Sequence, residues 1–271
     1  MSDGHVPEVM RRRHDVWHMR GGAQARDTAH MHKVLLIAHV AAGSAALLSM
    51  FVPMFTKKGG RAHRRGGWVF VAGMTVVSVT ALVLSAARFL FDSRPQAQAG
   101  AVFLFYVAIL TGAGVSAGMR ALRAKRRTGP HTHPWDIGLA ALLAASGLAM
   151  AGYGIVMRMP LFMAFSLLGI LNGTGQLRYW LRSQTSPMHW WYEHMSSMLG
   201  SCIAAVTAFL VNNAGNLGLP STSLIVWLTP TVIGVPTIVI WTRSYRRKFE
   251  KVVSQNRIQK TRSHVEAIEH V

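Results

Sequence analysis

The stretch from His194 to Asn213, HMSSMLGSCIAAVTAFLVNN, is almost wholly apolar and small after its first residue. A helix needs about 20 mostly apolar residues to cross the hydrocarbon of a bilayer. A segment surrounded by lipid must satisfy its backbone hydrogen bonds internally, so we expect it to be helical. The alternating pattern of a transmembrane barrel strand is absent. This stretch therefore predicts a membrane-spanning helix.

The rest of the chain repeats this pattern. Charged residues make up 14% and hydrophobic residues 51% of the 271 residues, whereas a soluble domain usually carries about 25% charged residues. The charges cluster in short patches between long apolar runs. These runs predict an all-α fold, a polytopic membrane bundle of seven transmembrane helices. The predicted spans are 34–55, 67–91, 100–119, 137–157, 160–181, 190–212 and 222–242.

The spans divide the chain into three parts. Residues 1–33 form a basic N-terminal tail, which we expect to be disordered because it lacks the composition of a packed core. Residues 34–245 form the seven-helix transmembrane domain, and residues 246–271 form a basic cytoplasmic C-terminal tail. Gly169 and Gly173 in the fifth span have the spacing that lets helices pack closely in lipid.

The loops differ in charge, and this difference predicts the orientation. TKKGGRAHRRGG after the first span and RALRAKRRTGPHTHPWD after the third each hold five Lys and Arg. The loops expected on the opposite side, DSRPQAQAG and NNAGNLGLPST, hold one between them. The positive-inside rule places the basic loops in the cytoplasm. We therefore expect a bacterial cytoplasmic (inner) membrane protein with its N-terminus outside and its C-terminus in the cytoplasm.

The N-terminal tail is at odds with this orientation, because residues 1–33 carry six Lys and Arg and would lie outside. There are two interpretations. Either the tail is translocated despite its charge, or the natural chain starts at Met31, which we prefer. The tail does not resemble a signal peptide, since no small-residue cleavage site follows its apolar region.

The formal net charge of +19 invites a nucleic-acid interpretation. We exclude it, because the Lys and Arg residues lie at the ends of apolar segments rather than on one exposed face. The expected partners are the lipid bilayer and, at the basic cytoplasmic loops, anionic lipids. The sequence leaves a homo-oligomer open. The single cysteine, Cys202, excludes an intrachain disulfide.

Three histidines are the candidate cofactor-binding residues. His39 lies inside the first span, and Gly43 on the same helix face could admit a flat cofactor such as haem. His63 lies in a glycine-rich basic loop that could hold an anionic headgroup or aim the ring back at the bundle. His194 shares a stripe with small residues, which predicts that it faces protein rather than lipid.

Three further residues are candidates for substrate binding. Asn172 and Gln176 are four apart on the fifth span, so they share a face and could bind a substrate or another helix. Glu193 stands at the cytoplasmic mouth of the sixth span. His131 and His133 form an HxH pair, which we interpret as part of a solvated basic loop rather than as a metal site.

Three stretches together resemble an uncharacterised family of bacterial predicted multi-spanning membrane proteins, a domain of unknown function. They are IAHVAAGSAALL through KKGGRAHRRGGWVF, then EHMSSMLGSCIAAVTAFLVNN, then WLTPTVIGVPTIVIWTRSYRRKF. The resemblance covers most of residues 34–249. It implies a multi-helix membrane protein whose recurrent polar positions correspond to His39, His63 and His194, and it implies no activity.

Three functions remain open from the sequence. The first is a redox protein with b-type haem held by inward histidines. His39 and His194 lie roughly 20 Å apart in depth at about 1.5 Å per residue, so they would serve separate sites. The second is a small-molecule carrier or binding protein, with a polar cavity beside a helix broken at Pro230 and Pro236. The third is a zinc-dependent membrane hydrolase, with Glu193 as its acid or base.

Overall fold

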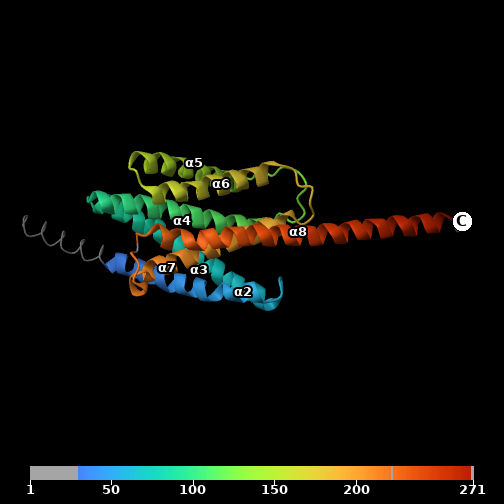
Figure 1. Cartoon of the computed structure of the whole chain (residues 1–271), viewed down its shortest axis with the longest axis horizontal. Coiled ribbons are helices and arrows are strands. Elements are labelled where there is room, and N and C mark those ends of the chain that lie inside the picture. Colours follow the sequence, from blue (N-terminus) through green and yellow to red (C-terminus); the bar gives the residue numbers. More distant parts are fainter. Residues whose placement is uncertain (1–29, 221, 270–271) are drawn as a thin grey trace, which may run out of the picture. The chain divides into compact units, whose positions relative to one another are not determined.

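The computed structural model describes residues 30–220 and 222–269, with side chains described as far as residue 249. The regular elements in these ranges are all helical, so the predicted all-α fold is confirmed. Residues 1–29 of the predicted disordered tail lie outside the described residues. In chain order the helices are His30–Phe55 (its last turn labelled α2, Phe51–Phe55), α3 (Arg61–Phe91), α4 (Pro95–Ala121), α5 (Pro134–Val156), α6 (Pro160–Leu181), α7 (His189–Asn213), the short η1 (Gly215–Leu217) and α8 (Leu224–Glu269) (Figure 1).

Six of the described helices are long and apolar enough to cross a membrane. They are the first helix together with α3, α4, α5, α7 and the Leu224–Phe249 part of α8. Helix α6 has 22 residues but is not among them. Asn172, Gln176 and Arg178 lie in its second half and lower its hydropathy. The count of seven is therefore not confirmed by length and composition.

The distribution of apolar residues suits a lipid surrounding. Large side chains face outward, as at Leu48 and Ile225, which are 72% and 74% exposed. Many small side chains lie in the interior, as at Ala46, Ala113 and Ala140, which are fully buried. Helices in lipid associate through close packing of small residues, because hydrocarbon solvates large apolar side chains as well as a protein core does.

The described residues divide into two compact units, one as far as residue 108 and one from residue 109 onward. In the first unit, the first helix packs on α3. A Cβ atom on Gly73 would lie 2.8 Å from the carbonyl oxygen of Ala42, and one on Gly66 would lie 2.7 Å from the side chain of Val52. Glycine therefore brings the two backbones together at two levels of this pair.

In the second unit, α5 and α6 form an antiparallel hairpin (Figure 1). A Cβ atom on Gly173 would lie 2.5 Å from the backbone nitrogen of Ala144, and one on Gly147 would lie 2.8 Å from that of Ile170. The backbone N–H of His131 donates to the carbonyl of Trp180 over 2.8 Å and ties the loop before α5 to the last turn of α6. The predicted packing role of Gly173 is confirmed.

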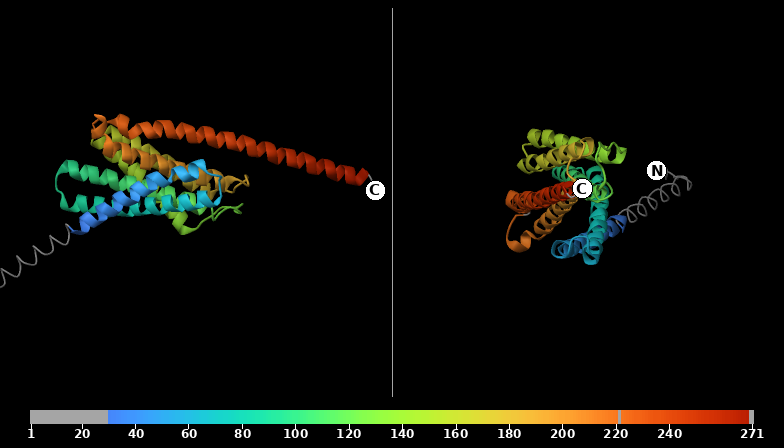
Figure 2. Two further views of the ribbon diagram at one scale, coloured as in Figure 1. Left: turned by 90° about the horizontal axis from the view of Figure 1, so that it is seen from below. Right: turned by 90° about the vertical axis from the view of Figure 1, so that its right-hand side faces the viewer.

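Helices α7 and α8 form another contacting pair of the second unit. Gly234 lies against the side chain of Ile203, and the rings of Trp191 and Tyr245 meet with centroids 4.8 Å apart. The predicted break at the two prolines of this helix is wrong, because α8 is continuous from Leu224 to Glu269 (Figure 2). Membrane helices tolerate proline when local adjustments satisfy the freed backbone groups.

Candidate functional site

His39 is fastened to the neighbouring helix of the first unit. Its Nδ1 lies 2.9 Å from Oγ1 of Thr80. Thr80 donates its own hydroxyl hydrogen to the Val76 carbonyl at 2.6 Å, so its oxygen accepts from Nδ1–H and Nε2 keeps the lone pair. An oxygen partner on one ring nitrogen orients a histidine whose other nitrogen binds a metal. The space beside Gly43, however, is occupied, because a Cβ there would meet Val77 at 3.5 Å.

His63 lies at the opposite end of α3. Its Nδ1 is 3.2 Å from the carbonyl oxygen of Pro53. His63 precedes Thr80 by 17 residues of α3, which is about 25 Å at 1.5 Å per residue. His39, which contacts Thr80, and His63 therefore cannot hold the same metal ion.

His194 faces protein, as its stripe of small residues predicted. Its Nδ1 lies 2.9 Å from the carbonyl oxygen of Gly118 on α4. Ser201, further along the stripe, would lie 3.2 Å from a Cβ atom on Gly114. Next to His194, a carboxylate oxygen of Glu193 accepts from the Ser197 hydroxyl at 3.3 Å. His63 belongs to the first unit and His194 to the second, and cofactor binding by either residue stays a prediction.

Asn172 and Gln176 have different environments. The Asn172 amide donates to the Leu168 carbonyl of its own helix at 2.7 Å, and its side chain is exposed. Gln176 is buried, with 6% of its surface exposed. The two side chains therefore differ in exposure, and substrate binding by them stays a prediction.

The strongest polar cluster of the second unit is one that the sequence reasoning missed. Asp136, in the first turn of α5, has a side chain only 2% exposed. Arg120, in the last turn of α4, donates to both of its carboxylate oxygens. His131 Nε2 lies 2.8 Å from the second of these oxygens. A two-pronged pairing of this kind is strong and directional, and it joins α4, the basic loop and α5.

Arg127 fixes the same basic loop to the end of α6. Its guanidinium donates to the carbonyl oxygens of Tyr179 at 2.8 Å and Trp180 at 3.2 Å, and also to those of Gly129 and Arg182. It lies over the Tyr179 ring, 4.8 Å from the centroid. A cation at a helix C-terminus satisfies carbonyls that lack intrahelical partners. Arg127 therefore has a structural role, because its charge fixes the basic loop to the end of α6.

His189 begins α7 and is 5% exposed. Its Nδ1 lies 2.9 Å from the Tyr179 hydroxyl oxygen. Its Nε2 is buried and has no hydrogen-bond partner within the described residues. The ring lines an open cavity of about 270 Å³ between the loop before α5 and the loop before α7. The other residues that line this cavity are Lys125, Arg126, Arg127, Thr128, Gln184, Thr185, Ser186 and Pro187.

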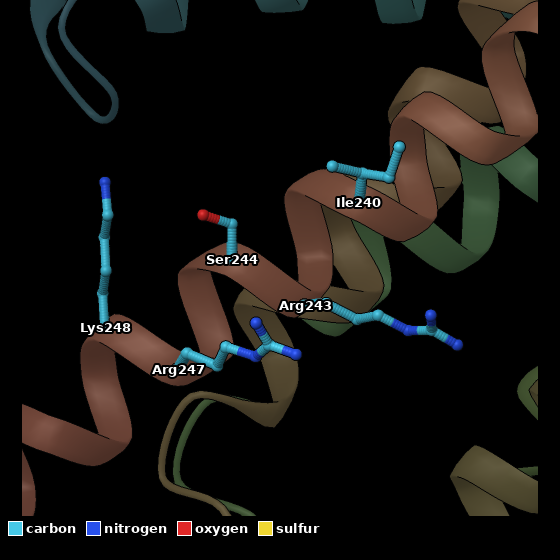
Figure 3. Close-up of a pocket in the computed structure, with 5 residues that line it drawn as sticks. All are labelled: Ile240, Arg243, Ser244, Arg247 and Lys248. Atoms are coloured by element: carbon cyan, nitrogen blue, oxygen red, sulfur yellow. The ribbon is translucent and has the colours of Figure 1, made fainter.

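A second hollow, of about 480 Å³, runs along one face of α8. Every residue that lines it comes from this helix, as Figure 3 shows: Ile240, Arg243, Ser244, Arg247 and Lys248. These residues follow the helical spacing i, i+3, i+4, i+7 and i+8, which puts the cations Arg243, Arg247 and Lys248 on one stripe of the helix. They follow directly after the apolar part of the helix, where the headgroups of a bilayer would begin.

No three His, Cys, Asp or Glu side chains within the described residues lie close enough together to hold a metal ion. Comparisons of the chain with family models, with curated proteins and with solved structures found no match. The resemblance to a family of membrane proteins therefore stays a prediction, and the functional argument depends on the geometry of the chain itself.

Proposed function

We propose that this chain is an integral membrane protein with seven spans, the seventh being α6. Helix α6 lies antiparallel to α5 along its whole length. At one end the backbone of His131 bonds to Trp180, and at the other a Cβ on Gly154 would lie 3.0 Å from Phe162. A bilayer that α5 crosses is therefore also crossed by α6. Its polar residues lower its hydropathy without changing its path.

The proposed orientation puts the basic end of the second unit in the cytoplasm. The turns at the other end, 157–159 and 214–220, hold one cation, Arg158. Lys and Arg in excess mark the cytoplasmic side of the cytoplasmic membrane. Seven spans then place the N-terminus outside. The basic side chains at the proposed cytoplasmic end are Arg120, Arg123, Lys125, Arg126, Arg127, Arg178, Arg182, Arg243, Arg246, Arg247 and Lys248.

The function that the geometry supports best is that of a carrier or binding protein for a small molecule, with its polar site at this end. The observation that carries the proposal is the cavity at His189, built on a network of buried polar groups. Buried ionisable groups in a membrane protein are costly, so a cluster of them is a candidate binding site. Arg120, Asp136 and Arg127 hold the two loops that form the walls, so the cavity is preformed.

A melting experiment on the purified full chain tests this function. Small molecules are grouped by chemistry as phosphate compounds, carboxylates, amines and uncharged sugars. A ligand at 100 times its Kd adds about 2.7 kcal/mol to the stability of the folded state. We expect one class to raise the melting temperature of the wild type and of a Gly175→Ala control, whose new Cβ meets open space. If no class shifts it, the proposed function is wrong.

Haem binding is the second candidate, because Thr80 orients the His39 ring and leaves its Nε2 without a hydrogen for ligation. A b-type haem needs such a nitrogen as an axial ligand. Purified protein with a Soret band that is lost on His39→Ala and kept on His32→Ala would support it. A colourless preparation from haem-replete cells would contradict it.

A further inference from the structure

We infer that the cavity at His189 binds a phosphoryl group. This inference depends on the proposed function and names its ligand class. The ligand is a phosphate compound dissolved in the cytoplasm or the phosphate of a lipid headgroup, which offer the same oxygens to the site.

The tautomer of His189 is set by Tyr179. The phenol oxygen lies 2.9 Å from Nδ1, and we assign the phenol hydrogen to this bond because no other acceptor for it is found among the described residues. Nδ1 therefore accepts, and Nε2 carries the hydrogen of the neutral ring. This buried N–H makes no hydrogen bond of good geometry among the described residues, although the backbone carbonyls of Lys125 and Arg127 face the ring. A buried donor without an acceptor is unfavourable, and a phosphoryl oxygen in the cavity would satisfy it.

A second donor comes from the loop before α7. The Ser186 hydroxyl oxygen accepts from the backbone N–H of Met188 at 3.3 Å. Its own hydrogen is therefore left to donate, and Ser186 lines the cavity. Helix α7 begins at His189 without a side-chain cap and has 25 residues. The start of a long helix carries partial positive charge and favours an anion.

The charges of the residues that line the cavity also favour a phosphoryl group. Lys125 and Arg126 line the cavity, and no Asp or Glu is among its lining residues. The Lys125 ammonium is held 4.5 Å from the centre of the Trp190 ring, next in sequence to His189. The two terminal nitrogens of Arg127 donate to backbone carbonyls, two of them in α6, while its buried Nε has no partner among the described residues. The donors come from two loops and a helix, an arrangement that suits three phosphoryl oxygens better than a planar carboxylate.

Titration of inorganic phosphate into the purified full chain tests the inference, with acetate as the carboxylate comparison. We expect phosphate to bind the wild type and to bind Ser186→Ala and Arg126→Gln about tenfold more weakly. Ser183→Ala, on the same loop but outside the cavity, and Arg158→Gln, at the opposite end, should bind as the wild type does. His189→Gln should also bind weakly, and its melting curve shows whether it folds.

The outcomes separate the ligand class from the function. Phosphate binding that Ser186→Ala and Arg126→Gln leave unchanged overturns the site. Stabilisation by another class without phosphate binding overturns the phosphoryl assignment and leaves the carrier or binding function standing. Nanodiscs with and without phosphatidic acid form the lipid arm. Binding of phosphatidic acid that needs Ser186 and Arg126, in the absence of binding of free phosphate and glycerol phosphate, assigns the phosphoryl group to a lipid.

Discussion

The hydroxyl oxygen of Tyr179 lies 2.9 Å from Nδ1 of His189, and this contact joins the last turn of α6 to the first turn of α7. Through this contact, the position of Tyr179 affects the tautomer of His189, the buried ring that lines the cavity. Removal of the Tyr179 hydroxyl should therefore change which ring nitrogen of His189 carries the hydrogen. It should leave the packing volume almost unchanged.

Tyr179→Phe tests this coupling. The variant keeps the ring under Arg127 but loses the hydroxyl, so Nδ1 competes with Nε2 for the hydrogen. We expect phosphate to bind about three- to tenfold more weakly, which corresponds to the ~0.5–1.5 kcal/mol of one hydrogen bond. The control is Tyr153→Phe, whose ring stacks on Phe162 at the other end of the unit. Equal affinity of Tyr179→Phe and wild type for phosphate would contradict the coupling.

Asp136→Asn tests the buried cluster. The substitution keeps the shape of the side chain but leaves the Arg120 guanidinium without its counter-ion. Breaking a buried pair by removing one partner costs about 3–5 kcal/mol. Since Arg120 is 22% exposed, we expect a loss near 3 kcal/mol in the free energy of unfolding, measured in mixed micelles.

The control for that loss is Asp92→Asn. Asp92 pairs with Arg94 in a loop, where the Arg94 side chain is 77% exposed. The hydrogen bond from Arg94 lowers the pKa of Asp92 to about 2, so this pair is also ionised at neutral pH. Exposed pairs add little stability, and we expect no measurable change. Similar losses for both variants would mean that burial of Asp136 is unimportant.

Gly173→Ala tests the α5–α6 hairpin. The added Cβ would lie 2.5 Å from the backbone nitrogen of Ala144, so the helices must separate. Overpacking of this kind costs about 1–3 kcal/mol. Gly175→Ala is the matched control on the same helix, because nothing lies within 4 Å of its new Cβ. Thermal unfolding of the two variants should differ clearly, and equal stability would show that α6 does not pack on α5 through Gly173.

Much of the helical framework could be predicted from the sequence, because the hydrocarbon requires long apolar runs. The predicted spans gave the apolar part of each helix and not its ends. Helix α3 starts at Arg61, six residues before the predicted span, where the headgroups of a bilayer would accept its basic residues. Helix α8 passes Pro230 and Pro236 without a break. Hydropathy measures the apolar part of a helix, whereas its length also depends on the polar residues at its ends.

The site was only partly predictable. The stripe that includes His194 correctly predicted a protein-facing ring, because helical spacing is local information. The pairing of Arg127 with Trp180 joins residues 53 positions apart and depends on how the helices meet. Asp136 did carry a signal, as the only acid within a strongly basic loop. Such a carboxylate, at the start of a span, indicates an ion pair even when its partner cannot be named.

The basic stripe of α8 leads to a prediction about lipids. A chain with Arg243→Gln, Arg247→Gln and Lys248→Gln loses three cations that line one hollow at the end of the apolar segment. Each basic residue near an anionic surface contributes about 1 kcal/mol of attraction. We expect native mass spectrometry to show fewer bound phosphatidylglycerol molecules per chain than in the wild type or in Arg158→Gln. Unchanged lipid retention would contradict the assignment of this stripe to headgroups.

Cysteine accessibility tests most directly the central claim, a membrane bundle with its basic end in the cytoplasm. The only native cysteine is replaced (Cys202→Ser), and Ser183→Cys or Met157→Cys is introduced at the two ends of α6. A membrane-impermeant maleimide should label position 157 in intact spheroplasts and position 183 only in inverted vesicles. Labelling of both positions from the same side, or labelling of position 183 from outside, would contradict the claim.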